Sequence, residues 1–409
     1  MTQKSDPKKE PMSIPACELL SPCGSRESLE AALRFGADAV YMGGPLLQMR
    51  AASAGFSLEA LQSAVHYAHD RGKKVYVTVN TLLKNGETEA LSDYGQALAA
   101  MGADGAIVSD IGAIRILRRV VPELLLHLST QCSVMNYEAA MAYFDMGIRR
   151  LVLAREMTLE DIAALHTRIP KELELEAFVH GAMCMAYSGR CLLSSFILGR
   201  SGNRGECAQP CRWEYALMEK KRPGQYFPIE QKENWSMLLS SRDLCMVEHL
   251  SALREAGVVS FKIEGRMKSD YYAAVVTNAY RMAMDGKDLS LCRQELDTVS
   301  HRPYTTGFYF GELPDGHFNS GLYEQPWTFC ATVENWNEGY ALLRQRNHMQ
   351  LGDVLYPLSP GRAGEHFILS SMEDEEGQSI TAAPHPGMMI RIPCPIPLEK
   401  GDYIRRQSR

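Results

Sequence analysis

The sequence of 409 residues predicts an α/β fold: a TIM-type (β/α) barrel followed by a small C-terminal antiparallel β-barrel domain. Up to Met284, short apolar segments alternate with amphipathic helices. Strands of a parallel sheet are covered on both faces and are therefore apolar throughout, so this alternation is typical of a parallel β/α fold. From about Tyr323 the helical signals vanish, and short β-like segments separated by turns predict the second domain.

Eight segments of the first domain have the composition of buried strands. Eight parallel strands with intervening helices favour a closed barrel over an open sheet. Residues 237–241 are a ninth candidate strand, so closure is not settled by the count, and the barrel could be irregular near this point. The eight predicted strands span residues 18–21, 39–42, 74–80, 105–110, 126–130, 150–154, 173–179 and 259–264.

The helices between these strands have recognisable starts and ends. Ser25 can cap the free N–H groups of the first helix, and Glu27 and Glu30 interact favourably with the helix dipole. Gly36 and Gly72 end the first two helices. The predicted helices span residues 25–35, 58–71, 90–101, 113–120, 137–145, 159–169, 244–256 and 270–284.

Composition shifts along the chain give the domain boundaries. Residues 1–17 are predicted to be a flexible tail, and residues 311–326, which contain proline and glycine, are the predicted linker. We therefore expect a barrel domain at 18–310, with a cysteine-rich insertion at 181–236, and a β-barrel domain at 327–409. The predicted strands of the second domain span residues 330–333, 340–343, 354–356, 367–369 and 389–392.

The overall composition, with 45% hydrophobic and 22% charged residues, is that of a globular enzyme. No apolar run reaches the roughly 18 residues of a membrane-spanning helix, and the polar start of the chain is unlike a signal peptide. Eleven cysteines, an odd number, argue against a disulfide framework and for a cytoplasmic protein. The net charge of −6 means that any RNA site must be a local basic patch.

One stretch of the sequence has the composition of a metal or cluster site. Four thiols follow the strand predicted at residues 173–179 and fall within 28 residues. Glycines between them let the backbone fold tightly around a small group. Thiolates select zinc, Cu(I) or iron–sulfur centres, and this spacing matches neither paired zinc knuckles nor the ferredoxin run. The four thiols belong to Cys184, Cys191, Cys207 and Cys211.

Polar residues at the ends of the predicted strands are the candidates for catalysis, because barrel enzymes react there. Each of them could instead be a helix cap or a strand-end hydrogen bond. His180 could act as a general acid or base, or it could simply cap its strand. The candidates are Asn80, Ser109, Asp110, Ser129, Gln131, Arg155, Glu156, Glu176, His180, Glu264 and Arg266; the predicted catalytic residues among them are His180, Glu176, Arg155 and Glu264.

The cysteine stretch also carries a family resemblance. Residues 176–184 (Glu-Ala-Phe-Val-His-Gly-Ala-Met-Cys) and 188–194 (Ser-Gly-Arg-Cys-Leu-Leu-Ser) resemble the signature of peptidase family U32, also called collagenase-like. Despite that name, the better-understood members are hydroxylases that modify tRNA wobble uridine, a ribosomal RNA cytidine or the ubiquinone ring. The resemblance implies a hydroxylase with a [4Fe-4S] cluster.

The resemblance further implies which thiols hold the cluster. The family's spacing assigns Cys184, Cys191 and Cys207 as the first three ligands. In the ubiquinone-hydroxylating relatives the fourth comes from a Ser-x-Asp-Leu-Cys segment, which here ends at Cys245. We therefore predict Cys245 as the fourth ligand, with Cys211 as the alternative. On chemistry alone, a four-thiolate zinc site is the strongest rival.

Further matches narrow the resemblance to one branch of the family. Residues 261–269 with the following Tyr271 and Tyr272, residues 301–308 and the β-domain resemble the prephenate-dependent tRNA uridine hydroxylases. This implies 5-hydroxyuridine as product, tRNA as substrate and prephenate as co-substrate. Cys23 stands where members of the family often have alanine, so its role stays open, as does that of Cys132.

Basic residues near the cysteines could contact RNA, and aromatic residues among them could stack an extruded base. A charge run is more often a solvated face, so this prediction depends mainly on the family. The other open functions are hydroxylation of another RNA or a ubiquinone precursor, a collagenase-like peptidase, which lacks a metal or nucleophile motif here, and a zinc-stabilised RNA-binding module. The predicted RNA contacts are Arg200, Arg204, Arg212, Lys220, Lys221 and Arg222.

Overall fold

The computed structural model describes residues 17–49, 55–184, 191–213, 216–217, 227–228, 242–311 and 323–408. Most of the predicted tail and linker, and the ninth candidate strand, lie outside these residues. The barrel strands are β1 (Glu18–Cys23), β2 (Ala39–Gly43), β3 (Lys74–Val79), β4 (Gly105–Val108), β5 (Leu126–Leu128), β6 (Arg150–Val152), β7 (Glu174–Ala182) and β11 (Val258–Ile263).

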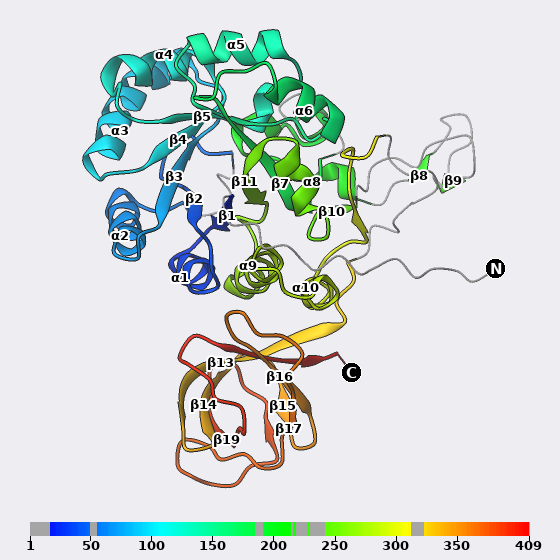
Figure 1. The fold of residues 1–409 in the computed structure, drawn as a ribbon. Helices are drawn as coiled ribbons and strands as arrows, with labels where there is room; N and C mark the ends of the chain where they lie inside the picture. Colours follow the sequence, from blue (N-terminus) through cyan, green and yellow to red (C-terminus); the bar gives the residue numbers. More distant parts are fainter. Residues whose placement is uncertain are drawn as a thin grey trace, which may run out of the picture.

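Within the described residues, these eight strands run parallel and form a closed barrel (Figure 1). Strands β1 to β7 are neighbours in chain order, and β11 closes the ring because it pairs with both β1 and β7. The predicted TIM-type barrel is therefore confirmed.

Helices cover the outside of the barrel (Figure 1). Ser25 caps the first of them as predicted, because its hydroxyl accepts a hydrogen bond from the N–H of Ser28 at 3.2 Å. No helix in the described ranges is both long and apolar enough to cross a bilayer. The helices are α1 (Arg26–Arg34), α2 (Leu58–His69), α3 (Thr88–Ala100), α4 (Ile111–Val120), α5 (Tyr137–Asp145), α6 (Leu159–His166), α8 (Leu250–Glu255), α9 (Asp270–Met284) and α10 (Leu289–Leu296), the last of which the sequence did not predict.

The chain departs from a regular barrel beyond β7. The helix predicted at residues 244–256 begins only at Leu250: its first two residues belong to strand β10 (Asp243–Cys245), and residues 246–249 form a turn. This short strand pairs antiparallel with the extended end of β7, and that pairing prevents its residues from joining α8. Strand β12 (Tyr304–Thr305) pairs with β10, and a buried ion pair of 2.6 Å between Arg302 and Asp243 holds the two together.

A bulge interrupts the seam at which the barrel closes. Lys262 of β11 pairs with Phe178, and the next residue, Ile263, pairs with His180, so Val179 is an extra residue on β7. A bulge re-aims the side chains beyond it. Phe178 therefore lines the inside of the barrel, whereas the ring of His180 lies against tyrosines of α9.

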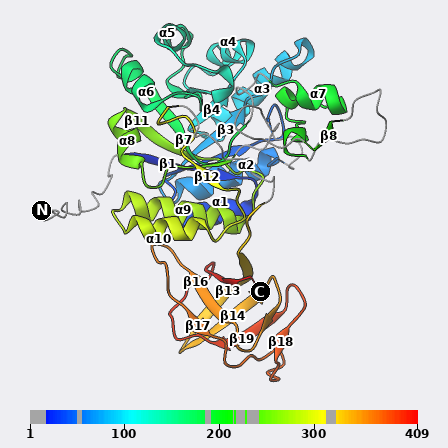
Figure 2. The same ribbon diagram turned by 90° about the vertical axis from the view of Figure 1, so that its right-hand side faces the viewer.

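Antiparallel strands form the second domain (Figure 2). Among the described residues, six of them make one sheet whose two edge strands do not pair, so the sheet is curled and not closed. The predicted antiparallel β-domain is confirmed, and its closure into a barrel is not found in this part of the chain. In sheet order the strands are β17 (Phe367–Ile368), β16 (Val354–Leu358), β20 (Tyr403–Gln407), β13 (Trp327–Asn337), β14 (Tyr340–Gln345) and β19 (Met389–Pro393).

The second domain rests on α1, α9 and α10 beside the barrel (Figures 1 and 2). Tyr271 of α9 stacks on Phe329 of β13, with ring centroids 4.9 Å apart. Arg405 of β20 forms a buried ion pair of 2.5 Å with Glu295 of α10. The apolar core of the barrel extends into the second domain through Tyr403. The two domains are therefore joined by apolar packing and by buried charge pairing.

Removing Arg405 should destabilise the chain, because it leaves the buried carboxylate of Glu295 without its partner. We expect Arg405→Ala to lower the free energy of unfolding by about 3–5 kcal/mol. The matched control is Arg344→Ala, whose pair with Glu334 leaves the arginine side chain 45% exposed, and which should cost about 0–1 kcal/mol. Urea unfolding measures both changes, and equal costs would contradict this account of the domain interface.

Candidate active site

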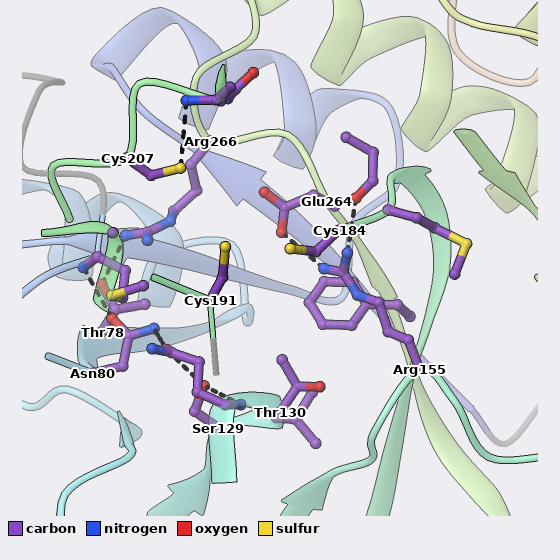
Figure 3. A pocket seen from close by; sticks show the side chains of 18 of the residues that line it. Thr78, Asn80, Ser129, Thr130, Arg155, Cys184, Cys191, Cys207, Glu264 and Arg266 are labelled. Carbon is purple, nitrogen blue, oxygen red and sulfur yellow. Dashed lines mark hydrogen bonds and ion pairs between the residues drawn. The ribbon is translucent and has the colours of Figure 1, made fainter. Parts of the chain in front are cut away.

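A cavity of about 190 Å³ opens at the carboxyl ends of the barrel strands (Figure 3). Side chains from β2, β3, β7 and β11 and from the loops after β5 and β6 line it. Part of the cysteine-rich segment, residues 191–211, covers it. This is the end of a β/α barrel at which active sites form.

Four thiols line this cavity in the part of the chain that the structure describes. Cys184 follows β7, and Cys191, Cys207 and Cys211 belong to the covering segment. Figure 3 shows Cys184, Cys191 and Cys207 around one space, at different sides of it. In the described ranges, no three side chains of the metal-binding types lie close enough to hold a single ion.

Two of these sulfur atoms accept hydrogen bonds from the main chain. The N–H of Leu193 donates to Sγ of Cys191, and the N–H of Gln209 donates to Sγ of Cys207, each at 3.4 Å. Leu193 begins helix α7 (Leu193–Leu198), so the first of these donors comes from a helix start. Hydrogen bonds to sulfur are a recurrent feature of protein-bound iron–sulfur clusters.

Two contacts hold the covering segment over the barrel. Gly205 has a φ of +88°, and a Cβ there would lie 2.7 Å from the backbone oxygen of Gln48, so only glycine allows this approach. Arg204 forms an ion pair of 2.6 Å with Glu87, which directly precedes α3. The loops after β2 and β3 therefore position the thiols of this segment.

Cys245 lies elsewhere. It belongs to β10, opposite His180 of β7, and is 6% exposed. It is not among the described residues that line the cavity, and its Sγ lies 4.0 Å from the hydroxyl of Tyr280. Burial raises the pKa of its thiol. Cys211, the alternative ligand, lines the cavity with the other three thiols and Cys245 does not, and the ligand set itself stays a prediction.

Two arginines reach the cavity from different sides (Figure 3). Arg155 donates to the carbonyl oxygen of Ala182 at 2.7 Å and lies 3.5 Å from the carboxylate of Glu264. Arg266 donates to the hydroxyl of Thr78 at 2.7 Å. Because a guanidinium is always charged in proteins, the cavity presents two fixed positive charges close to the thiols.

A third part of the wall is polar and uncharged. The side-chain amide of Asn80 donates to the amide oxygen of Gln131 at 2.7 Å, and the hydroxyl of Ser129 donates to the same oxygen at 3.1 Å. All three residues were candidates from the sequence, and all three line the cavity. Amide and hydroxyl groups can both donate and accept, so this wall can recognise a neutral ligand by hydrogen bonding.

Two family models match the chain. The model of peptidase family U32 matches residues 24–319, and that of the peptidase family U32 C-terminal domain matches residues 325–405. The chain belongs to peptidase family U32. The two matches together include both domains of the structure.

Relatives within family U32 carry different names. The chain is 34% identical to tRNA hydroxylation protein P of Escherichia coli, over 93% of this chain and 94% of that protein. It is 41% identical to a 23S rRNA 5-hydroxycytidine synthase of the same organism, over 66% of this chain and 39% of that enzyme. It is also 33% identical to a collagenase of Porphyromonas gingivalis, over 74% and 75% of the two chains.

Of the catalytic residues predicted for this U32 chain, Arg155 and Glu264 line the cavity and His180 does not. The bulge at Val179 turns the imidazole of His180 into the core, where it is 1% exposed and packs against the ring of Tyr280. Burial lowers the pKa of His180 to about 3, so the ring is neutral near pH 7. Its position favours the alternative to general acid–base catalysis, a structural role at the strand end.

Glu176 lies beneath the cavity and not in its wall. Its carboxylate is fully buried and accepts a hydrogen bond from Nζ of Lys262 at 2.6 Å. Lys262 itself lines the cavity and was not among the catalytic residues predicted from the sequence. The spacing of polar residues in the sequence could have indicated this role. Ser260 and Lys262 are two residues apart on β11, so their side chains share the inner face of the strand.

The predicted RNA contacts have different positions. Arg200 is an exposed residue of the covering segment, whereas Arg204 of the same segment is held by Glu87. The side chain of Arg212 and all of Lys220, Lys221 and Arg222 lie outside the described residues.

The two cysteines whose roles stayed open are also placed. Cys23 is fully buried in the barrel core, as expected of a small apolar residue, and burial raises the pKa of its thiol. Cys132 lies next to β5, where its Sγ is 3.2 Å from the carbonyl oxygen of Ser109. Neither is among the described residues that line the cavity.

Gly205→Ala should detach the covering segment. Its Cβ would collide with the backbone near Gln48, so we expect Cys191 and Cys207 to react faster with a thiol reagent than in the unaltered protein. Gly199→Ala is the matched control: Gly199 has a φ of +66° but no atom within 4 Å of the added Cβ, so it carries only the backbone cost of about 1–2 kcal/mol. Equal thiol reactivity in the two variants would show that the contact with Gln48 does not hold the segment.

Proposed function

We propose that this U32 chain is a cytoplasmic tRNA hydroxylase that forms 5-hydroxyuridine at the wobble position, with prephenate as co-substrate and a [4Fe-4S] cluster as cofactor. The observation that carries the proposal is the shared cavity. Four thiols, two arginines and a wall of uncharged polar groups meet at the carboxyl end of the barrel. The thiols suit a redox cofactor, the arginines suit an anionic co-substrate, and the uncharged polar groups suit an RNA base.

The donor set fits an iron–sulfur cluster. Cys184, Cys191, Cys207 and Cys211 supply the four thiolates that a [4Fe-4S] cluster requires, and two of them already accept main-chain hydrogen bonds. When bound, such a cluster supplies electron transfer. The protein's part is to hold the thiols, through Gly205 and the loops below it, and to cover the cavity from water.

The two guanidinium groups suit a dicarboxylate such as prephenate. A carboxylate accepts two parallel hydrogen bonds from the fork of an arginine, and Arg155 and Arg266 approach the cavity from different sides. Such a ligand would lie beside the cluster thiols. The residues then bind and orient the co-substrate, and Glu264 fixes the orientation of Arg155 through its ion pair of 3.5 Å.

A uridine base must leave its stack to reach this cavity. Asn80, Gln131 and Ser129 offer donors and acceptors for the edge of an extruded base, which is how single-stranded RNA is read. Arg200 is exposed on the covering segment and is available for the phosphate backbone. Arg204 is engaged by Glu87, and the side chain of Arg212 and residues 220–222 lie outside the described residues, so their role in RNA binding stays a prediction.

The extent of the similarity favours tRNA among the family's substrates. The named tRNA hydroxylation protein matches this chain across both domains and nearly its whole length, whereas the ribosomal RNA enzyme matches over 39% of its own length. A peptidase has less support, since no histidine is among the described residues that line the cavity, and a cysteine there lacks an imidazole base.

Metal analysis tests the cofactor. Protein purified without oxygen should contain about four iron and four sulfide per chain. Cys184→Ser, Cys191→Ser, Cys207→Ser and Cys211→Ser should each lose iron because each removes a ligand. Cys245→Ser and the buried Cys292→Ser are the controls and should keep it. Iron loss in Cys245→Ser but not in Cys211→Ser would reverse the ligand assignment, and stoichiometric zinc in place of iron would favour the RNA-binding module.

Nucleoside mass spectrometry tests the reaction. Bacteria that lack their own tRNA uridine hydroxylases should regain 5-hydroxyuridine in tRNA when they express this chain. With purified protein, Arg155→Gln and Arg266→Gln should raise the KM for prephenate about 10- to 100-fold, because each removes a charged hydrogen bond. Arg200→Gln, outside the cavity, should leave that KM unchanged. An unmodified tRNA pool in the expressing strain would contradict the proposed function.

A further inference from the structure

Charged and hydroxyl-bearing side chains fill the inside of this barrel beneath the cavity. TIM barrels usually fill this space with branched apolar residues. Here Lys262 is 3% exposed, Glu176 and Ser260 are fully buried, and Arg150 is 5% exposed. Buried charges cost free energy unless each is paired and hydrogen-bonded, so a set of this size in a barrel core indicates a use.

Among these buried polar residues, Lys262 is the one that reaches the cavity. Its Nζ donates to Oε1 of Glu176 at 2.6 Å and lies 4.5 Å from the ring centroid of Tyr41. Burial lowers the pKa of Lys262, the carboxylates of Glu176 and Glu264 oppose that shift, and the guanidinium of Arg150 adds to it. Because Nζ and Oε1 of Glu176 are 2.6 Å apart, one proton can pass from the ammonium to the carboxylate without any change in net charge.

The far end of the set reaches the opposite face of the barrel. The hydroxyl of Ser260 lies 3.4 Å from Oε2 of Glu176 and 2.8 Å from Oε1 of Glu18. A hydroxyl both donates and accepts, so it can pass a proton between two carboxylates. Glu18 begins β1 and its side chain is 13% exposed, so it can exchange protons with water.

Arg150 fixes the two carboxylates. Its Nη1 donates to Glu18 at 2.6 Å and to Glu176 at 3.3 Å. Tyr76 also donates to Glu18, at 2.7 Å. An arginine does not give up its proton in proteins, so Arg150 cannot itself relay one. It keeps the spacing of Glu18, Ser260 and Glu176 short enough for proton transfer between them.

We propose that Lys262, Glu176, Ser260 and Glu18 form a proton relay from the cavity to solvent at the amino end of the barrel. Lys262 gives a proton to Glu176, and the resulting amine takes one from the cavity. Glu176 passes its proton through the hydroxyl of Ser260 to Glu18, which releases one to water. One proton moves in all, and every group regains its starting charge.

Only the purpose of the relay rests on the proposed function. In that function, the relay removes the proton that carbon 5 of the RNA base loses when it is hydroxylated. The covering segment and the bound RNA would separate the cavity from water at its mouth. Lys262 is the group that touches the cavity, and the other three act through it.

Nitrogen-15 NMR of lysine-labelled protein tests the relay without any catalysis. The experiment measures how fast the hydrogens on Nζ exchange with solvent, and Lys262→Met identifies the signal. Ser260→Ala removes the bridging hydroxyl and leaves all charges in place. It should slow exchange at Lys262 by about tenfold or more, the scale of loss when one positioned proton carrier is removed. Glu18→Gln, which interrupts the relay at its solvent end, should act in the same direction.

Ser21→Ala is the matched control. Ser21 is also fully buried in the barrel wall, and its hydroxyl bonds to Thr277 at 2.8 Å, outside the relay. Exchange at Lys262 should stay at the rate of the unaltered protein. Fast exchange in both Ser260→Ala and Glu18→Gln would show that protons reach Lys262 from the cavity mouth, and would overturn the relay.

Turnover gives a second and separate test. Ser260→Ala should lower kcat, leave the KM for tRNA unchanged and increase the solvent deuterium isotope effect, whereas Ser21→Ala should change none of the three. Unchanged kcat and isotope effect in Ser260→Ala would also overturn the relay. Unaltered protein that forms no 5-hydroxyuridine would contradict the proposed function instead, and the NMR result would still decide the relay.

Discussion

The parallel pairing of β7 with β11 is the contact on which the rest of the structure depends. It closes the barrel and brings Lys262 beside Phe178. The bulge at Val179 then turns His180 away from the cavity. Gly181, at a φ of +102°, lets the chain pass the backbone of Glu264, where an added Cβ would lie 2.6 Å from the carbonyl oxygen. Beyond this point β7 delivers Cys184 to the cavity, so one seam decides which side chains meet there.

Charge pairing makes the interior of this barrel possible. Below the cavity, each buried charge has an opposite partner, as in the contact of 2.6 Å between Lys262 and Glu176. Inside the cavity, Arg155 has a partner in Glu264, while Arg266 lies among the hydroxyl and amide groups of Thr78 and Gln48. Both guanidinium groups are positively charged and line the same cavity as the thiols. The same scaffold therefore places charged and polar side chains in the cavity wall above and a paired polar core below.

One turn of helix α9 contacts both the second domain and the wall of the cavity. Tyr271 stacks on Phe329 of the second domain. Its neighbour Tyr272 points the other way and donates a hydrogen bond to the carbonyl oxygen of Glu264 at 2.9 Å. Because these tyrosines are adjacent on a rigid helix start, the position of the second domain and that of the cavity wall are mechanically linked. The β-domain is thus part of the architecture that supports the site.

The sequence by itself determined the alternation of strands and helices, the two domains and the thiol-rich insertion after the strand predicted at residues 173–179, since periodicity, caps and glycine stops are local signals. It also placed Arg155 and Glu264 at strand ends. Only the tertiary structure decided that Cys211 reaches the cavity while Cys245 and His180 do not. Those outcomes depend on a strand pairing and a bulge between segments far apart in the chain, and one residue of register changes the face to which a side chain points.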